Sequence, residues 1–423
     1  MKNTIYIIGV FLIIFFAFSC NSNKKVTKKK NFAYIYNPTS TSLHPEYLIY
    51  HKSESVSLLM IKFYPGELLF NQTNEDKEFR AELKFSYRVF EQETKDLIDS
   101  SSATIEINLD EVQEEMISFI PFKATFGSNY VIQIITKDVK RNSQHRMALN
   151  VNKKDKYNSQ NYIVRKFGTS APIFNSRLDS TIRFFIEYAH GDYDSLNVKF
   201  YESNFFIPNP PSINVVKIDK LEIPDSQYVL RMSDTNIFRI NKKGLYTFQV
   251  DTGELNGIRL SYFSESYPFI VMADDLAEPL SYLMNDNDFK KLEKNINKKL
   301  AVDNFWLDAA KDNIEIAREL IRIYYNRAYL ANYYFTSYKE GWKTDRGMIY
   351  MIYGLPNYIY KSDVNERWIY EEIQGPNELY FKFKRIQHPF TENHYILERS
   401  ELLQTRWKDA VESWKNGKPY TFN

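Results

Sequence analysis

Residues 341–356 read GWKTDRGMIYMIYGLP, and this stretch decides how the C-terminal part of the chain folds. It follows a helical pattern, so Gly341 allows that helix to end in a left-handed conformation. Trp342 can then fold back beneath the helix and bury a large apolar area. Gly347 permits a close backbone approach before a strand that we predict at 348–353. The stretch therefore predicts a turn that joins a helix to a strand.

The polar residues of this turn have structural partners within reach. Thr344 and Asp345 can accept hydrogen bonds from backbone N–H groups, and Asp345 can also pair with Arg346 or with Arg327 of the helix. Acid–base catalysis needs a second positioned titratable group, and none is evident nearby in the sequence. We therefore favour a structural turn over a catalytic or ligand site.

Helical periodicity surrounds this turn and predicts an α+β domain at 273–423. One helix is expected to bury a face and to start at Asp286 or Asp288; the face comprises Phe289, Leu292, Ile296 and Leu300. A longer helix is expected at 313–338 and a closing helix at 400–415. Short strands are expected at 367–371 and 379–384.

The N-terminal two thirds of the chain show the period of two that is typical of half-buried strands. Leu83, Phe85, Tyr87 and Val89 alternate with polar residues, and about seven such strands predict an antiparallel β-sandwich at 32–151. A polar linker at 152–160 precedes a second β region at 161–272. Pro208, Pro210 and Pro211 indicate an extended loop inside it. The predicted fold class is multidomain, with two antiparallel β-sandwich-like domains followed by the α+β domain.

The chain of 423 residues starts with a segment that is typical of a signal peptide, at 1–19. Its apolar run at 5–18 is shorter than the roughly 20 residues that a spanning helix needs. The segment Ala17-Phe18-Ser19-Cys20 resembles a bacterial lipobox, which implies a diacylglycerol on Cys20. Cys20 is the only cysteine in the sequence, so the chain can form no internal disulfide.

Residues 20–31 form a Lys-rich tether after this cysteine. Such a polar segment cannot pack a core, and its lysines suit either solvent or anionic headgroups. No acidic residue follows Cys20 closely. In similar lipoproteins an acidic stretch resembles a surface-export signal, so its absence implies an outer-membrane lipoprotein that faces the periplasm.

The stretch 341–356 resembles the signature of the GWxTD-domain family of bacterial envelope lipoproteins of the Bacteroidota type. The five defining residues are Gly341, Trp342, Thr344, Asp345 and Arg346, and the likeness extends through Gly347 to the turn with Gly354 and Pro356. The helix at 327–335 and the strand with Trp368 and Tyr370 are also similar to that family. Asn357 stands where many members have an aspartate. The resemblance implies no defined activity and no cofactor.

Histidine and acidic clusters offer little support for a metal site. His388 and His394 flank Glu392, but their spacing of six and Pro389 favour a loop with two solvated imidazoles. Residues 190–194 contain a D-x-D pattern without the remainder of a calcium loop, so we interpret them as a turn.

The composition and the motifs of the sequence argue against several classes of function. The net charge of +2 gives no field for gathering nucleic acid, and the sequence has no phosphate-binding loop or nucleophile elbow. We therefore expect a non-enzymatic envelope protein, held at a membrane by its lipid, that acts as an interaction or assembly scaffold for other envelope proteins. No cofactor, metal, nucleotide or nucleic acid is expected. The alternative is an envelope enzyme or glycan-binding protein with a site near Asp345, Arg346 and His388.

Overall fold

The computed structural model describes residues 31–72, 78–191, 193–231, 237–251, 256–371 and 378–420. Phe32–Asn423 form one unit by their internal contacts. The predicted signal peptide, Cys20 and nearly all of the tether lie outside the described residues. Among the described residues, no helix combines the length and apolarity needed to cross a membrane.

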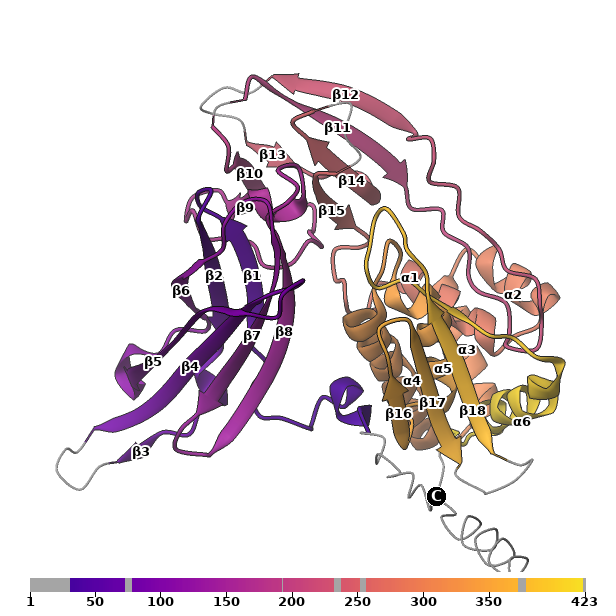
Figure 1. Cartoon of the computed structure of the whole chain (residues 1–423). Helices are drawn as coiled ribbons and strands as arrows, with labels where there is room; N and C mark the ends of the chain where they lie inside the picture. The colour runs from indigo at the N-terminus through magenta and orange to yellow at the C-terminus, as the bar shows by residue number, and fades with distance from the viewer. Residues whose placement is uncertain are drawn as a thin grey trace, which may run out of the picture. The chain divides into compact units, whose positions relative to one another are not determined.

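Several antiparallel sheets make up the N-terminal part of the chain (Figure 1). The first strands are β1 (Glu46–His51), β2 (Val56–Phe63), β3 (Asn71–Gln72), β4 (Phe79–Glu91), β5 (Leu97–Asn108), β6 (Met116–Lys123), β7 (Asn129–Asp138) and β8 (Ser143–Asn152). One sheet has the order β1-β2-β6; the other has the order β3-β4-β7-β8, with β5 also paired to β4. Short 3-10 helices lie at Ala33–Tyr36 (η1), Pro65–Glu67 (η2) and Leu109–Glu111 (η3).

Residues from both of these sheets pack into one hydrophobic core. On β4, the inward residues Leu83, Phe85, Tyr87 and Val89 are buried, as their alternation with polar residues predicts. Ile61 of β2 and Ile132 of β7 reach the same core from the two sheets. The arrangement is consistent with the predicted sandwich.

The second β region also contains two antiparallel sheets. Its elements are η4 (Ser159–Asn161), β9 (Tyr162–Lys166), β10 (Arg183–Tyr188), β11 (Ser195–Glu202), β12 (Ser226–Arg231), β13 (Phe238–Arg239), β14 (Gly244–Gln249) and β15 (Ile258–Tyr262). The sheet orders are β13-β10-β9 and β12-β11-β14-β15, and both sheets contribute to a separate core. The prolines at 208–211 lie in an irregular segment between β11 and β12, as predicted.

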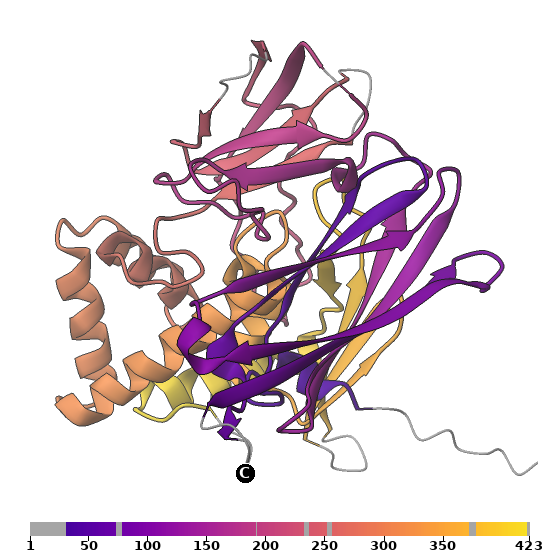
Figure 2. The same ribbon diagram turned by 90° about the vertical axis from the view of Figure 1, so that its left-hand side faces the viewer.

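The C-terminal region is mainly helical, with one antiparallel sheet of order β16-β17-β18-β19. Its helices are α1 (Ala273–Ala277), η5 (Glu278–Tyr282), α2 (Asp286–Glu293), α3 (Lys298–Ala309), α4 (Ile314–Phe335), η6 (Gly341–Lys343), α5 (Asp345–Tyr353), η7 (Glu401–Leu403) and α6 (Gln404–Lys415). Its strands are β16 (Tyr358–Lys361), β17 (Asn365–Glu371), β18 (Leu379–Arg385) and β19 (Tyr395–Leu397). Helices and sheet share one large aromatic core, and Figure 2 shows the orange and salmon helices gathered together.

The predicted strand at 348–353 is wrong, because these residues form the body of α5. Thr344 begins the helix as its N-cap, with its side chain accepting a hydrogen bond from the backbone N–H of Gly347. Every residue of α5 is buried, so its sequence shows no apolar stripe with the helical period. Its aromatic and branched residues therefore resembled a strand.

The predicted helix with a face from Phe289 to Leu300 is also wrong. The chain breaks after α2 and restarts as α3, and Asn285 and Asn297 cap the two helices in place of the predicted aspartates. Leu292 is buried in the core, whereas Ile296 lies between the helices and is fully exposed. Two asparagines that offer capping side chains thus outweigh the apolar periodicity.

Leu292 and Ile296, which the predicted helix placed on one buried face, provide a matched test. We expect Leu292→Ala to lower the free energy of unfolding by about 2–5 kcal/mol, because it leaves a cavity in the core. We expect Ile296→Ala to change it by less than about 0.5 kcal/mol. Urea unfolding of both variants measures the difference, and equal losses would support one continuous helix instead.

Candidate functional site

The signature residues lie in η6 and in the first turn of α5, after the end of α4. Two of them, Gly341 and Gly347, are needed because the backbone packs closely here. A Cβ on Gly341 would lie 2.0 Å from the carbonyl oxygen of Ala331 in α4. A Cβ on Gly347 would lie 1.9 Å from the carbonyl oxygen of Gly341. The φ angle of Gly341 is not positive, and α4 already ends at Phe335, so the predicted left-handed helix stop is wrong. Gly341 serves backbone approach instead.

Trp342 is buried in the core beside α4. Its backbone N–H donates to Oδ1 of Asn332, 3.1 Å away, and its carbonyl accepts a hydrogen bond from the hydroxyl of Tyr282 at 2.8 Å. The rings of Tyr282 and Trp342 also meet edge to face. Asn332 is itself fully buried and donates to the carbonyl of Pro268. Trp342 thus ties η6 to α4 and to η5.

Asp345 pairs with Arg399, not with Arg346 or Arg327 as predicted. The Nη2 of Arg399 lies 2.5 Å from Oδ1 of Asp345, and its Nη1 lies 3.1 Å from Oδ2, which makes a two-point contact. The backbone N–H of Leu397 also donates to Oδ2 at 2.8 Å. Both charged side chains are more than nine-tenths buried. This pair fastens the first turn of α5 to the end of β19.

Arg346 points into a buried polar network with Glu366 of β17. Nη1 of Arg346 lies 3.3 Å from Oε1 of Glu366 and 3.2 Å from the hydroxyl of Tyr36. Oε1 also accepts from Lys361 and Tyr36, and Oε2 accepts from the indole N–H of Trp368. Burial raises the pKa of Glu366, but the positive charges of Arg346 and Lys361 outweigh burial and hold it below its usual value.

The other guanidinium nitrogen of Arg346 reaches the loop before β19. Nη2 donates to the backbone carbonyl and to the side-chain oxygen of Asn393, at 3.0 and 2.5 Å. The guanidinium also lies 3.9 Å from the ring centre of Tyr395. Arg346 therefore joins η1, β17 and the 388–394 loop through one side chain.

The turn after α5 uses a different arginine. Arg327 of α4 donates to the carbonyls of Met351 and Ile352, which lie in the last turn of α5. Gly354 follows with a φ of +78°, and a Cβ there would lie within 2.9 Å of the Arg327 guanidinium. Pro356 is buried, and Asn357 donates through its side chain to the carbonyl of Tyr370. The asparagine at this divergent position therefore has a structural role.

The imidazoles of His388 and His394 are half-buried against Tyr338, whereas the prediction had them solvated. The ring of His388 stacks on Tyr338 with a centroid separation of 4.2 Å, and His394 meets the same ring at 5.2 Å. Burial, with neighbouring positive charges, lowers the pKa of both histidines to about 4. Glu392 faces Arg385. The cluster is an aromatic packing element of the loop.

The described residues include no group of three or more His, Cys, Asp or Glu side chains arranged to hold a metal ion. The residues around the D-x-D pattern connect β10 to β11, where His190 pairs with Asn161 at 2.8 Å. Asp192 of that pattern lies outside the described residues.

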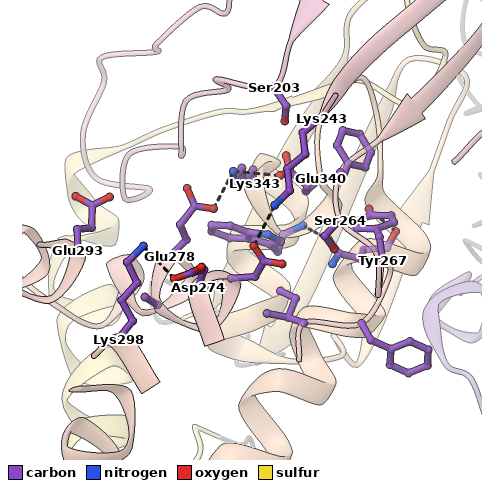
Figure 3. A pocket seen from close by; sticks show the side chains of 17 residues that line it. Ser203, Lys243, Ser264, Tyr267, Asp274, Glu278, Glu293, Lys298, Glu340 and Lys343 are labelled. Atoms are coloured by element: carbon purple, nitrogen blue, oxygen red, sulfur yellow. Dashed lines mark hydrogen bonds and ion pairs between the residues drawn. The ribbon is translucent and has the colours of Figure 1, made fainter. Parts of the chain in front are cut away.

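A pocket of about 330 Å3 opens beside η6 (Figure 3). Trp342 and Lys343 line it, whereas Asp345, Arg346 and His388 do not. Nζ of Lys343 lies 3.0 Å from Glu278 and 3.1 Å from Glu340. Burial lowers the pKa of Lys343, but the two carboxylates outweigh burial and raise it above its usual value.

The other two lysines of the pocket are paired as well. Lys243 lies 3.3 Å from Asp275, and Lys298 lies 3.6 Å from Asp274. Figure 3 shows Lys298 beside Asp274, and Lys343 with Glu278 and Glu340, around the hollow. Each lining lysine is therefore ion-paired with a carboxylate, which leaves it poorly suited to act as a base or nucleophile.

The site is thus a buried, ion-paired turn between two helices, backed by an antiparallel sheet. Residues 244–416 match the family model of the GWxTD domain, so this part of the chain is a GWxTD domain. The match runs from β14 to α6 and contains the Asp345–Arg399 and Arg346–Glu366 pairs. It begins well before residue 273, the predicted start of the C-terminal domain.

No curated protein matches the chain. Two solved structures of Bacteroides uniformis β-glucuronidase, one of them β-glucuronidase 2 covalently bound to cyclophellitol-6-carboxylate aziridine, are similar to part of it. Each has 11% identity and a TM-score of 0.17, and each match covers 34% of this chain and 14% of the other. Likeness at this level carries no argument about fold or activity.

Several residues that complete the site could not be recognised in the sequence. Tyr36, Glu366, Asn393 and Arg399 supply the partners of Asp345 and Arg346 from distant positions. Only Glu366 had a signal in the sequence. It stands two residues before Trp368, which is in a predicted strand, so the alternation of the strand places both side chains on the same inward face.

Asp345→Asn tests whether the motif is structural. We expect this variant to lower the free energy of unfolding by about 3–5 kcal/mol, because it leaves the buried guanidinium of Arg399 without its counter-charge. Adding Arg399→Met should restore part of the loss, so the two effects should not sum. Unfolding of the four proteins of this double-mutant cycle measures the coupling. Unchanged stability of Asp345→Asn would contradict the structural role.

His388 and His394 are expected to make the stability of the folded chain sensitive to acid. Their pKa is about 4 in the folded chain against 6.5 ordinarily, so the unfolded chain binds more protons between these values. Their contribution to stability is therefore complete above pH 6.5 and is lost as the pH falls towards 4. We expect the His388→Gln/His394→Gln variant to lose less stability than the wild type between pH 7 and 5. Parallel pH dependences in thermal unfolding would contradict this assignment.

Proposed function

We propose that this protein is an outer-membrane lipoprotein of the bacterial cell envelope, facing the periplasm, that acts as a non-enzymatic interaction or assembly scaffold. In this proposal the acyl chains on Cys20 hold it at the bilayer through the tether at 20–31. The two β regions are sandwich-like domains, and they and the GWxTD domain offer surfaces to other envelope proteins. The lipobox-like segment at 17–20 supports the anchor.

One observation carries the non-enzymatic part of the proposal. The two charged signature residues, Asp345 and Arg346, are buried and ion-paired with Arg399 and Glu366. Groups that act on a substrate must be able to contact it, and these contact other parts of the fold. Their burial favours a scaffold over an enzyme or glycan-binding protein with its site near Asp345, Arg346 and His388.

Metabolic labelling with an alkyne fatty acid tests the anchor. We expect the wild type to carry the label and to fractionate with membranes, and Cys20→Ser to lose both properties, because Cys20 is the only sulfhydryl in the chain. Mild crosslinking in membranes, followed by purification of the chain, should recover partner proteins in stoichiometric amounts. An unlabelled mature chain would contradict the anchor, and recovery of bulk lipid alone would contradict the scaffold.

A further inference from the structure

The segment between β11 and β12 leaves a row of apolar side chains in solvent. Figure 1 shows it as two extended stretches without strand arrows, running out from β11 and back to β12. Five large branched residues of its returning stretch are exposed; these are Ile213, Val215, Val216, Ile218 and Ile223, of which Ile218 and Ile223 are 74% and 81% exposed. We call residues 213–223 the apolar strip. Such residues are costly in water unless a partner covers them.

The backbone of the apolar strip is open as well. Among the described residues, no backbone N–H of 214–223 donates a hydrogen bond, and the side chain of Asn209 donates to the carbonyl of Val215. The neighbouring chain on either side is bonded, since β11 and β12 pair with each other. An extended stretch with free donors and acceptors is a template for an added β-strand.

The apolar strip is nevertheless held firmly on its inner side. The buried carboxylate of Asp219 lies 2.8 Å from Nζ of Lys339 and accepts a hydrogen bond from the hydroxyl of Tyr338 at 2.8 Å. Its other oxygen accepts from the backbone N–H of Phe206. Leu221 packs into a small aromatic cluster that contains Tyr338. Lys339 immediately precedes Glu340 and the GWxTD signature, so the GWxTD domain positions the strip.

The open backbone decides what class of partner fits. A lipid surface would cover the apolar side chains but would leave the N–H groups without acceptors, at several kcal/mol for each group in hydrocarbon. An added polypeptide strand satisfies both. For a second copy of the strip, two-fold pairing centred between Ile218 and Asp219 places Lys217 opposite Lys220 twice, which disfavours that register.

We propose that the apolar strip 213–223 is the docking site for an extended segment of another envelope protein. That segment adds to the strip as a β-strand, with apolar side chains against Val215 and Ile218 and carboxylates opposite Lys217 and Lys220. The proposal rests on the scaffold function and names the surface through which it acts.

Photo-crosslinking on the full-length chain in native membranes tests this surface. The probe is p-benzoylphenylalanine in place of Lys217, with the same group in place of the fully exposed Ile296 as the control position. We expect a crosslinked product at 217 and none at 296, with the attachment points confined to one continuous stretch of one partner.

Val216→Pro, in a chain carrying the probe at 217, removes one open N–H that bonds to none of the residues the structure describes. We expect it to reduce the crosslink yield at least tenfold while leaving the thermal unfolding midpoint unchanged, since only the added strand needs that donor. Ile218→Asp should reduce the yield similarly, whereas Leu402→Asp, at another exposed apolar residue, should not.

Each other outcome overturns the proposed surface. An undiminished yield with Val216→Pro, attachment of the probe to lipid, or a crosslinked dimer of the chain would each contradict strand addition by another protein. If mild crosslinking recovers a stoichiometric partner but the probe at 217 captures nothing, the strip is wrong and the scaffold function stands. If neither recovers a partner, both are wrong.

Discussion

The buried pair of Arg346 and Glu366 is the constraint on which the GWxTD domain depends. Each side chain is almost completely removed from solvent, and an isolated charge in that position would be prohibitively costly. The surrounding groups solve this by giving nearly every polar atom a partner: Tyr36, Lys361 and Trp368 for the carboxylate, and Asn393 for the guanidinium. Elements that are remote in the sequence must therefore meet before either charge can be buried.

A second pair, Asp345 with Arg399, acts on the neighbouring residue of the same helix. Because adjacent positions on a helix point in different directions, Asp345 and Arg346 reach different parts of the sheet. Together with Thr344 as N-cap and the closely packed Gly341 and Gly347, they fix where α5 begins. The signature therefore positions one fully buried helix, α5. This role explains why its polar residues, Asp345 and Arg346, point into the fold.

Half-buried elements could be predicted from the sequence, and fully buried or remotely stabilised ones could not. The alternation along β4 and the stripe along α4 are visible because one side of each element faces water. The helix α5 has no solvent side, so its pattern carried no period, and a strand was predicted there. Likewise Arg399 is 54 residues from Asp345, and no local spacing relates them. The capping asparagines, Asn285 and Asn297, are visible in the sequence, but the prediction followed the apolar periodicity and missed the break between α2 and α3.

Tyr36 lies only a few residues after the predicted tether, yet it packs in the core of the GWxTD domain and bonds to Glu366. The backbone N–H of Phe32 likewise donates to Ile359 in β16. The chain thus begins its described fold with contacts to the GWxTD domain, and strands β1 to β13 come before the range that matches this domain. A mechanical load applied through the N-terminal end would consequently reach the GWxTD domain before it reaches the sheets of the first β region.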